Sequence, residues 1–186
     1  THAGTTMLRS NAGADTVHVL TTAGVTTTDT GAGIDIINIR TIGAVTTVNA
    51  GADDDTINVG SLIPASGGTV SGISALLTVN GEEGVDRLYV DDTDDSDPNT
   101  GILTATMITD LGMSDGITYG TLEYLNISLG SGADTFTIQS THGNSTRLRT
   151  NVGNDTVHIQ STSGFTAVYT DAGDDIVNVK SINALT

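Results

Sequence analysis

Seven aspartates recur along the chain, each at the same place in a short repeated phrase. Glycine stands two residues before six of the seven, and an apolar side chain stands two residues after every one. Carboxylates at a fixed period form a column if equivalent units stack on one another. The chemistry open to such a column is acid catalysis or the binding of cations by oxygen ligands. The seven residues are Asp15, Asp35, Asp55, Asp86, Asp134, Asp155 and Asp175.

A column of stacked carboxylates favours a cation. At a separation of about 5 Å, two like charges repel by about 0.9 kcal/mol in water and by several times more near a protein surface. The glycine before each aspartate lets the backbone present carbonyl oxygens to the same space. Carboxylate and carbonyl oxygens together are the ligands of Ca²⁺, whereas Mg²⁺ demands tighter geometry. With the seven aspartates, the predicted metal ligands are Gly13, Gly31, Gly33, Gly51, Asp53, Gly132, Gly153, Asp171 and Gly173.

The simpler alternative is that aspartate and glycine are good turn residues and bind nothing. One such turn would be weak support for a metal site. Seven turns at a common phase favour calcium. The chain has no cysteine, which excludes disulfides and thiolate metal sites and leaves oxygen ligands.

The residues that follow each aspartate alternate with a period of two, which is typical of β-strands. After Asp15, Val17 and Val19 are expected to face inward, and Thr16 and His18 outward. A second strand is expected before each turn, since an apolar or threonine residue lies seven positions before each aspartate. These residues are Leu8, Thr28, Val48, Val79, Ile127, Leu148 and Val168.

Each coil is therefore predicted to be a strand, a Gly–Asp turn, a second strand and a plain turn. The phrases recur in one direction, and about 20 residues are too few for a helical crossover, so the coils should stack in parallel. Successive aspartates are 20, 20, 31, 48, 21 and 20 residues apart. We predict an all-β parallel β-solenoid, a β-roll or β-helix, of about eight coils with the Gly–Asp turns on one edge. An outward loop at 61–72 enlarges one coil, and one coil, built from 101–108 and 117–127, lacks the motif.

A longer period is superimposed on the coils. Residues 1–46 align without gaps on residues 141–186, and 23 of the 46 positions are identical. Residues 1–186 thus read as a single solenoid segment that holds about one and a third copies of a 140-residue unit. We expect its source to be a very long protein with this unit in tandem. Neither end has an evident cap, so head-to-tail stacking with adjacent repeats or with another copy is expected.

The turn phrases, among them NAGAD at 11–15, GAGID at 31–35 and NVGND at 151–155, resemble the calcium-binding nonapeptide of repeats-in-toxin (hemolysin-type) proteins. In that motif, G-G-x-G-x-D-x-U-x, the second glycine corresponds to Gly31, Gly51 and Gly130 here. Asn11, Asn151, Asp171 and Glu82 replace it elsewhere; asparagine and aspartate still tolerate a left-handed backbone. The resemblance covers most of the chain except roughly 91–128. It implies a calcium-loaded β-roll in a secreted bacterial protein.

Composition excludes several classes of function. The net charge is −16, which argues against nucleic acid and anionic membrane surfaces. Aromatic residues make up 3% of the chain and tryptophan is absent, so only a thin core of valine and isoleucine is expected. No apolar run reaches the roughly 18 residues that span a bilayer.

Other polar patterns suggest alternatives to a metal column. His18 and His158, with Asn38, Asn58 and Asn178, are interpreted as a polar ladder on an exposed sheet face and not as catalytic groups. The six basic residues do not cluster as a lyase site would need, so no enzyme is predicted. The acidic run 91–101 is interpreted as a solvated loop that could hold one calcium ion. A ladder of outward threonines suggests ice binding; it would comprise Thr26, Thr28, Thr46 and Thr166.

The sequence therefore predicts a calcium-binding structural segment of a long extracellular or cell-surface protein, such as an adhesin, stalk or filament. Calcium would fold and stiffen it outside the cell. The alternative is a non-catalytic accessory or polysaccharide-binding module of a secreted enzyme, with a surface glycan as partner.

Overall fold

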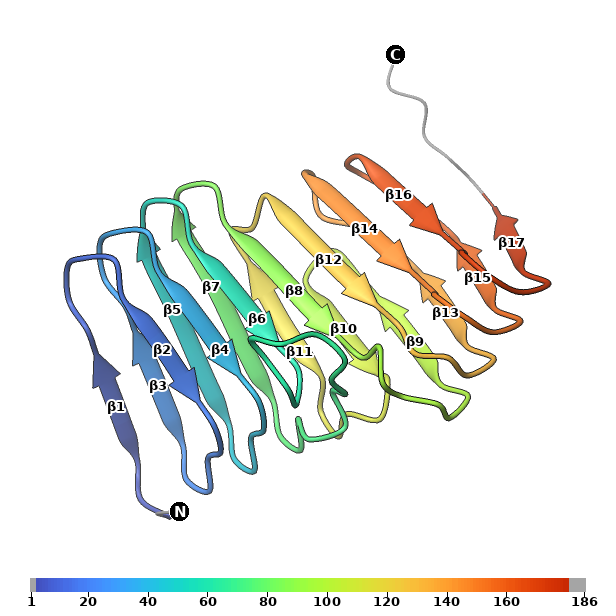
Figure 1. The fold of residues 1–186 in the computed structure, drawn as a ribbon. Coiled ribbons are helices and arrows are strands. Elements are labelled where there is room, and N and C mark those ends of the chain that lie inside the picture. Colours follow the sequence, from blue (N-terminus) through green and yellow to red (C-terminus); the bar gives the residue numbers. More distant parts are fainter. Residues whose placement is uncertain (1–2, 181–186) are drawn as a thin grey trace.

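The computed structural model describes residues 3–180 and contains 17 strands and no helix in that part of the chain (Figure 1). The strands form two sheets that face each other. The all-β prediction is confirmed, and the parallel-rich sheets are consistent with a β-solenoid. Since no helix is present in residues 3–180, none is long and apolar enough to cross a membrane.

The two sheets differ in size. The ten-stranded sheet contains, in spatial order, β1 (Thr6–Arg9), β3 (Thr26–Asp29), β5 (Thr46–Ala52), β7 (Leu77–Glu83), β11 (Ile117–Gly120), β10 (Met107–Asp110), β9 (Thr100–Leu103), β13 (Thr135–Ile138), β15 (Thr156–Ile159) and β17 (Ile176–Val179). The seven-stranded sheet contains β16 (Thr166–Tyr169), β14 (Ser145–Arg149), β12 (Tyr124–Ser128), β8 (Arg87–Asp91), β6 (Thr56–Val59), β4 (Ile36–Ile39) and β2 (Thr16–Val19).

Strand pairing is parallel everywhere except at β10, and the repeats pair in register. Val17, Ile37, Ile57 and Leu88 are direct neighbours across β2, β4, β6 and β8. The residues seven positions before the aspartates are also in register. They form the rows Leu8–Thr28–Val48–Val79 and Ile127–Leu148–Val168. Equivalent residues thus stack as the period of about 20 predicted.

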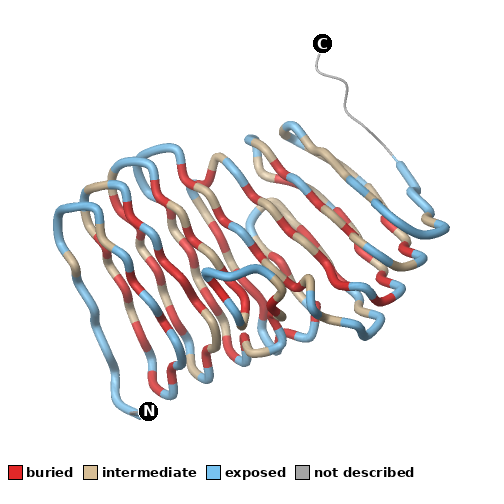
Figure 2. The backbone as a smooth tube through the Cα atoms, in the orientation of Figure 1, coloured by how far each residue is buried: buried red, intermediate tan, exposed pale blue. Residues whose placement is uncertain are grey.

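The core is a thin layer of aliphatic side chains between the sheets (Figure 2). Val17 and Val19 face inward as predicted, and Ile37 and Ile57 are fully buried. Branched side chains of this kind fit the pleated surface of a strand, which explains why strands form here. The connection at 61–72 contains no strand, as expected of a loop, but Val70 is fully buried, so part of the loop packs onto the core.

The segment from 92 to 123 differs from the prediction of one plain coil. Three consecutive strands, β9, β10 and β11, all lie in the ten-stranded sheet, and β10 runs antiparallel to both neighbours. Positive φ angles occur at Asp110, the last residue of β10, and at Leu111, Gly112 and Gly116 in the connection from β10 to β11. The eight paired coils that we expected are instead ten strands facing seven.

The sheet that leads into the aspartate turns changes across this segment. Before it, β1, β3, β5 and β7 lead into the aspartate turns from the ten-stranded sheet. After it, β12, β14 and β16 lead into the turns from the seven-stranded sheet. The prediction that all Gly–Asp turns lie on one edge is therefore wrong. Five strands, β8 to β12, lie between Asp86 and Asp134, and each strand runs from one edge of the stack toward the other. This odd number places Asp134, Asp155 and Asp175 on the opposite edge.

Candidate functional site

Along the first edge, the carboxylates of Asp35, Asp55 and Asp86 each accept the backbone N–H of the aspartate one coil earlier. We call this row the first ladder. Its hydrogen bonds run from Asp15 N to Asp35 Oδ1 (2.7 Å), from Asp35 N to Asp55 Oδ1 (2.8 Å), from Asp55 N to Asp86 Oδ1 (2.9 Å) and from Asp86 N to Glu123 Oε2 (2.7 Å). The ladder continues without a break through the enlarged coil between Asp55 and Asp86. The loop at 61–72 lies at the opposite edge of the stack and does not separate the two turns.

A second ladder of the same kind runs along the other edge. Its hydrogen bonds run from Asn99 N to Asp134 Oδ1 (2.8 Å), from Asp134 N to Asp155 Oδ1 (2.8 Å) and from Asp155 N to Asp175 Oδ1 (2.9 Å). The structure thus brings the seven predicted aspartates together as a group of four and a group of three.

Within the described residues 3–180, the second carboxylate oxygen of most ladder residues is buried and has no hydrogen-bond partner. This applies to the Oδ2 atoms of Asp15, Asp35, Asp55, Asp86 and Asp155. A buried oxygen without a partner costs about 1–3 kcal/mol, and more if it carries charge. The ladder therefore leaves one strong acceptor per coil that a proton or a cation can satisfy.

Burial disfavours the charged form of these carboxylates. It raises the pKa of Asp55 to about 6. The backbone N–H of Asp35, which donates to the Asp55 carboxylate, opposes this shift, and repulsion by Asp86 adds to it. Burial likewise raises the pKa of Asp86 and of Asp134 above the ordinary value. The interior of each ladder thus holds carboxylates whose charged form would be stabilised by a bound cation at neutral pH.

The turns hold a left-handed backbone two and four residues before most ladder aspartates. Positive φ angles occur at Asn11 and Gly13, Gly31 and Gly33, Gly51 and Asp53, Glu82 and Gly84, Asn151 and Gly153, and Asp171 and Gly173. The substitution of asparagine, aspartate and glutamate for glycine is therefore compatible with this conformation. At Gly51 a side chain would also collide with the backbone carbonyl of Gly31 in the coil below. The glycines let successive turns stack closely and keep their carbonyl groups near the edge.

Gly132 is a predicted ligand residue whose turn is built differently. Gly130 and Gly132 are not among the residues with positive φ. Added side chains there would instead collide with the carbonyl groups of Asp95 and Asp97. Close stacking, and not a left-handed backbone, requires glycine at these two positions.

The acidic run at 91–101 belongs to the second ladder and is not a separate loop. Asp95, Asp97 and Asn99 stack on Gly130, Gly132 and Asp134, respectively. The Asp95 carboxylate accepts hydrogen bonds from the Asp97 N–H and from the Asn99 side-chain amide, both at 2.9 Å. The signal was an Asp-x-Asp-x-Asn phrase 35 residues before Gly-x-Gly-x-Asp.

Glu123 was missed because no Gly-x-Asp phrase surrounds it. It follows β11 at the place where the Gly–Asp turn follows β7, and its longer side chain reaches the Asp86 N–H. The pairing of β11 with β7 is the only signal for this role, and it exists only in three dimensions.

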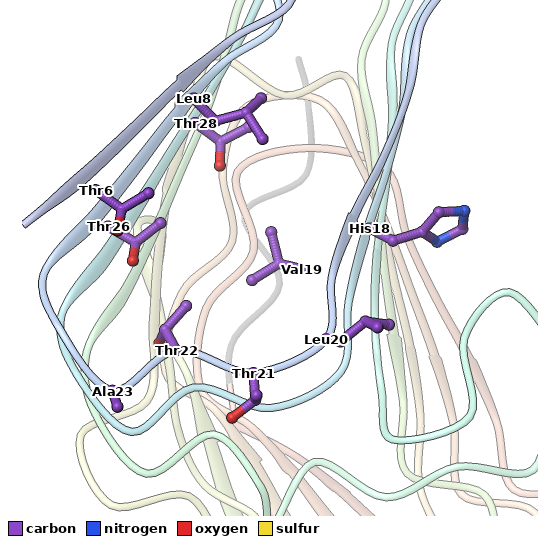
Figure 3. A pocket seen from close by; sticks show the side chains of 10 residues that line it. All are labelled: Thr6, Leu8, His18, Val19, Leu20, Thr21, Thr22, Ala23, Thr26 and Thr28. Carbon is purple, nitrogen blue, oxygen red and sulfur yellow. The ribbon is translucent and has the colours of Figure 1, made fainter. Parts of the chain in front are cut away.

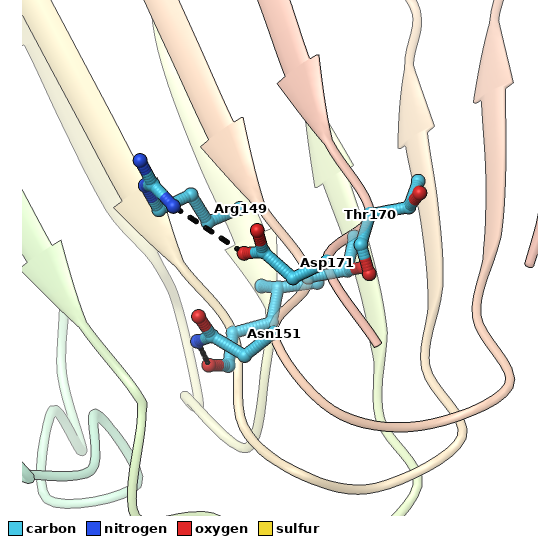
Figure 4. A network of polar contacts seen from close by, with 6 residues as sticks. Arg149, Asn151, Thr170 and Asp171 are labelled. Atoms are coloured by element: carbon cyan, nitrogen blue, oxygen red, sulfur yellow. Dashed lines mark hydrogen bonds and ion pairs between the residues drawn. The ribbon is translucent and has the colours of Figure 1, made fainter. Parts of the chain in front are cut away.

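Two further acidic features lie outside the ladders. A shallow groove beside the first ladder is lined by Asp29, Gly31, Gly51, Ala52, Glu82 and Glu83. Asp171, a predicted ligand, instead forms an ion pair with Arg149 at 3.4 Å (Figure 4). The Asn151 amide in the same view donates to the Leu129 carbonyl. The side chain of Asp171 is thus engaged on the surface.

The oxygen atoms at the ladders are of the kind that bind Ca²⁺, but acidic side chains alone do not form a complete site. No group of three or more His, Cys, Asp or Glu side chains in residues 3–180 is placed to hold a metal ion. An ion at a ladder would take the buried Oδ2 of an aspartate, and backbone carbonyl groups of the stacked turns would supply further oxygens. Oxygen ligands of these two kinds suit calcium.

The remaining polar patterns have structural roles. Asn38 contacts His18 at 3.4 Å and accepts from Asn58 at 3.0 Å, which makes a polar row on the outer face of the seven-stranded sheet. Thr26, Thr28 and Thr46 are buried, so the outward threonine ladder suggested for ice binding is wrong at these positions. The outward row on the ten-stranded sheet is one residue later, at Thr27, Thr47, Thr78 and Thr118.

Comparison with known protein families, characterised proteins and solved structures found no match for the chain. The geometry of the two ladders is therefore the basis for assigning a function.

Proposed function

We propose that the chain is a calcium-binding structural segment of a long extracellular or cell-surface protein, with a repeats-in-toxin-like β-roll organisation. The observation that carries the proposal is the row of buried Oδ2 atoms without partners on Asp15, Asp35, Asp55, Asp86 and Asp155. Each is a strong acceptor next to a turn whose backbone carbonyl groups stack on those of its neighbours. Calcium would bind these oxygens and offset the repulsion along each ladder.

Calcium would act as a folding switch in this proposal. A site that exists only in the folded chain turns binding free energy into folding free energy. At 100 times the dissociation constant, one such site adds about 2.7 kcal/mol to stability. With several sites in one stack, the acidic chain would be loosely folded at low calcium and stiff at roughly millimolar calcium, the range of extracellular modules.

A calcium titration of two matched variants tests the proposal. Asp35→Asn keeps an oxygen for the Asp15 N–H but replaces one carboxylate oxygen with an amide, which is a poor calcium ligand. Asp115→Asn removes the same charge at an exposed position outside the ladders. We expect Ca²⁺ to raise the melting temperature of the wild type and of Asp115→Asn, and a chelator to reverse the rise.

Asp35→Asn should show a clearly smaller response to Ca²⁺. Mg²⁺ at the same concentration serves as the control ion, and it should stabilise less. A wild-type melting temperature that responds to neither calcium nor chelator would sink the calcium proposal.

A second candidate function, polysaccharide binding, is favoured by a shallow groove on the outer face of the seven-stranded sheet. Asn58, Tyr89 and Asn126 line it together with the loop residues Ile63 and Pro64. An exposed tyrosine beside amide groups can stack on a sugar ring and bond its hydroxyl groups. A glycan array with wild type and Tyr89→Ala tests it; binding that Tyr89→Ala abolishes would support this candidate.

A further inference from the structure

The 140-residue repeat does not return to the same place in the fold. Residues 6–9 and 146–149 are equivalent by sequence, but β1 lies in the ten-stranded sheet and β14 in the seven-stranded sheet. The same exchange separates β2 from β15, β3 from β16 and β4 from β17. Consecutive repeats are thus related by a half-turn about the long axis of the stack, which swaps the two sheets.

The cause is that one repeat contains an odd number of strands, so the next repeat begins in the other sheet. One repeat, β1 to β13, places eight strands in one sheet and five in the other. Repeats that all kept the same orientation would add three unmatched strands to one sheet each time, a mismatch of about 14 Å per repeat. Repeats that alternate place thirteen strands in each sheet for every two copies, so the mismatch cancels.

The two ends of the stack formed by residues 3–180 are complementary in hydrogen bonding. Within residues 3–180, the Asp175 N–H has no acceptor, although the equivalent N–H of Asp155 donates to Asp175 Oδ1. At the other end, Asp15 Oδ1 has no donor among the residues that the structure describes, although Asp35 Oδ1 accepts from the Asp15 N–H. A donor at one end and an acceptor at the other can continue one ladder.

The apolar surfaces of the two ends are complementary as well. Val177 is 45% exposed, whereas its neighbour Val157 in β15 is fully buried. Leu8 is 39% exposed, whereas its neighbour Thr28 is buried. Figure 3 looks into this N-terminal end, where Leu8, Thr28 and Val19 point into the space between the sheets and His18 points away.

We propose that a second copy of this chain docks on the end formed by β16 and β17 with its sheets exchanged, β1 on β16 and β2 on β17. The Asp175 N–H then donates to Asp15 Oδ1 of the second copy, and the second ladder continues into the first ladder of that copy. In this register Val177 lies beside Val17, and Asn178 lies beside His18, as Asn38 does within the chain. The inference deepens the structural role proposed above by giving the partner and its orientation.

Disulfide trapping distinguishes docking with the sheets exchanged from docking with the sheets in the same places. Because the chain has no cysteine, no native thiol competes with the introduced ones. Exchanged docking brings Met7 of one copy beside Ala167 of the other, and His18 beside Asn178, since the register of β14 with β16 and of β15 with β17 continues. Direct docking would bring Met7 beside Asn178. Cα atoms on paired strands are within the 4.4–6.8 Å that a disulfide needs.

Four single variants are mixed in pairs under mild oxidation with Ca²⁺ present: M7C, H18C, A167C and N178C. We expect M7C with A167C and H18C with N178C to give the cross-linked dimer at least tenfold faster than M7C with N178C or H18C with A167C. Equal yields in all four mixtures, or the reverse preference, would overturn the proposal. So would a chain that sedimentation shows to be monomeric at every concentration.

The outcome is separate from that of the calcium titration. The titration reads the response of the melting temperature to the ion, and the cross-links read which strands meet. A chain that docks as stated but ignores calcium would refute only the proposed calcium role.

Discussion

The backbone N–H of Asp86 donates to Glu123 Oε2 at 2.7 Å, across 37 residues of sequence. Glu123 is thereby the last residue of the first ladder. Asn99, in the same inserted segment, is the first residue of the second ladder. The ladder changes edge at this point: the Glu123 carboxylate accepts on one edge, and the Asn99 backbone N–H donates on the other. The hydrogen bond therefore joins the two halves of the molecule. In the first half the aspartate turns follow strands of the ten-stranded sheet, and in the second half they follow strands of the seven-stranded sheet.

Removing the Glu123 carboxylate should cost stability. Glu123→Ala leaves the Asp86 N–H without an acceptor, and we expect a loss of about 1–3 kcal/mol in the free energy of unfolding. Glu123→Gln keeps an acceptor and should lose less. Glu83→Ala, at an exposed position of the same edge, is the control. Urea denaturation measures all three; equal stability of Glu123→Ala and Glu83→Ala would contradict the assigned role.

Gly51 should tolerate no side chain. Gly51→Ala combines a φ angle of +110° with a collision against the Gly31 carbonyl group, so we expect a loss of about 3 kcal/mol or more. Gly67→Ala is matched, because φ is +88° there but the space is open, and it should cost only about 1–2 kcal/mol. Chemical denaturation gives the difference between the two, which isolates the stacking of the turns. A Gly51→Ala loss no larger than that of Gly67→Ala would show that the turns stack loosely.

Stability without calcium should fall as the pH rises from 5 to 8. Burial raises the pKa of Asp92 from 3.8 to about 7, with repulsion by Asp95 adding to the shift. The folded state then binds more protons than the unfolded state between these two values, so the stabilisation is full below pH 4 and is lost as the pH passes 7. The Oδ1 atom of Asp92 accepts the Val70 N–H at 2.9 Å, and Oδ2 is buried without a partner.

Asp92→Asn keeps the bond to Val70 and cannot titrate. Its free energy of unfolding in chelator should therefore change less between pH 5 and pH 8 than that of the wild type. Asp115→Asn, at an exposed site, should retain the wild-type difference. A wild type that is more stable at pH 8 than at pH 5 would contradict the assignment.

Gly101 and Phe136 should be energetically coupled. They are register partners on β9 and β13, and a side chain at position 101 would meet the Phe136 ring. Gly101→Ala should cost about 1–3 kcal/mol through overpacking. Phe136→Leu should make room for it, so the double variant should lose less stability than the sum of the two single variants. Simple additivity in a denaturation cycle would mean that the two residues do not share the space.

Much of the architecture was predictable because its causes are local. The period of two around each aspartate identifies the strands and their inward residues, such as Val17 and Ile57, since alternation depends only on strand geometry. The period of about 20 places equivalent residues in register. Glycine, asparagine and aspartate at positions such as Gly31 and Asn11 mark left-handed turns, since few other residues tolerate them.

The arrangement of the two ladders depended on tertiary structure. Which sheet a strand joins is decided by long-range pairing, and β10 reverses direction where the pattern of residues 101–127 reads like an ordinary coil. Five strands therefore lie between Asp86 and Asp134, and this odd number places Asp134, Asp155 and Asp175 on the opposite edge. The same segment brings Glu123 and Asn99 into the ladders. Glu123 carries no turn signal of its own, and Asn99 joins through its backbone N–H. The sequence by itself determined strands, register and a periodic carboxylate; only the packing of the sheets decided that the carboxylates form two ladders and that successive repeats are turned by half a revolution.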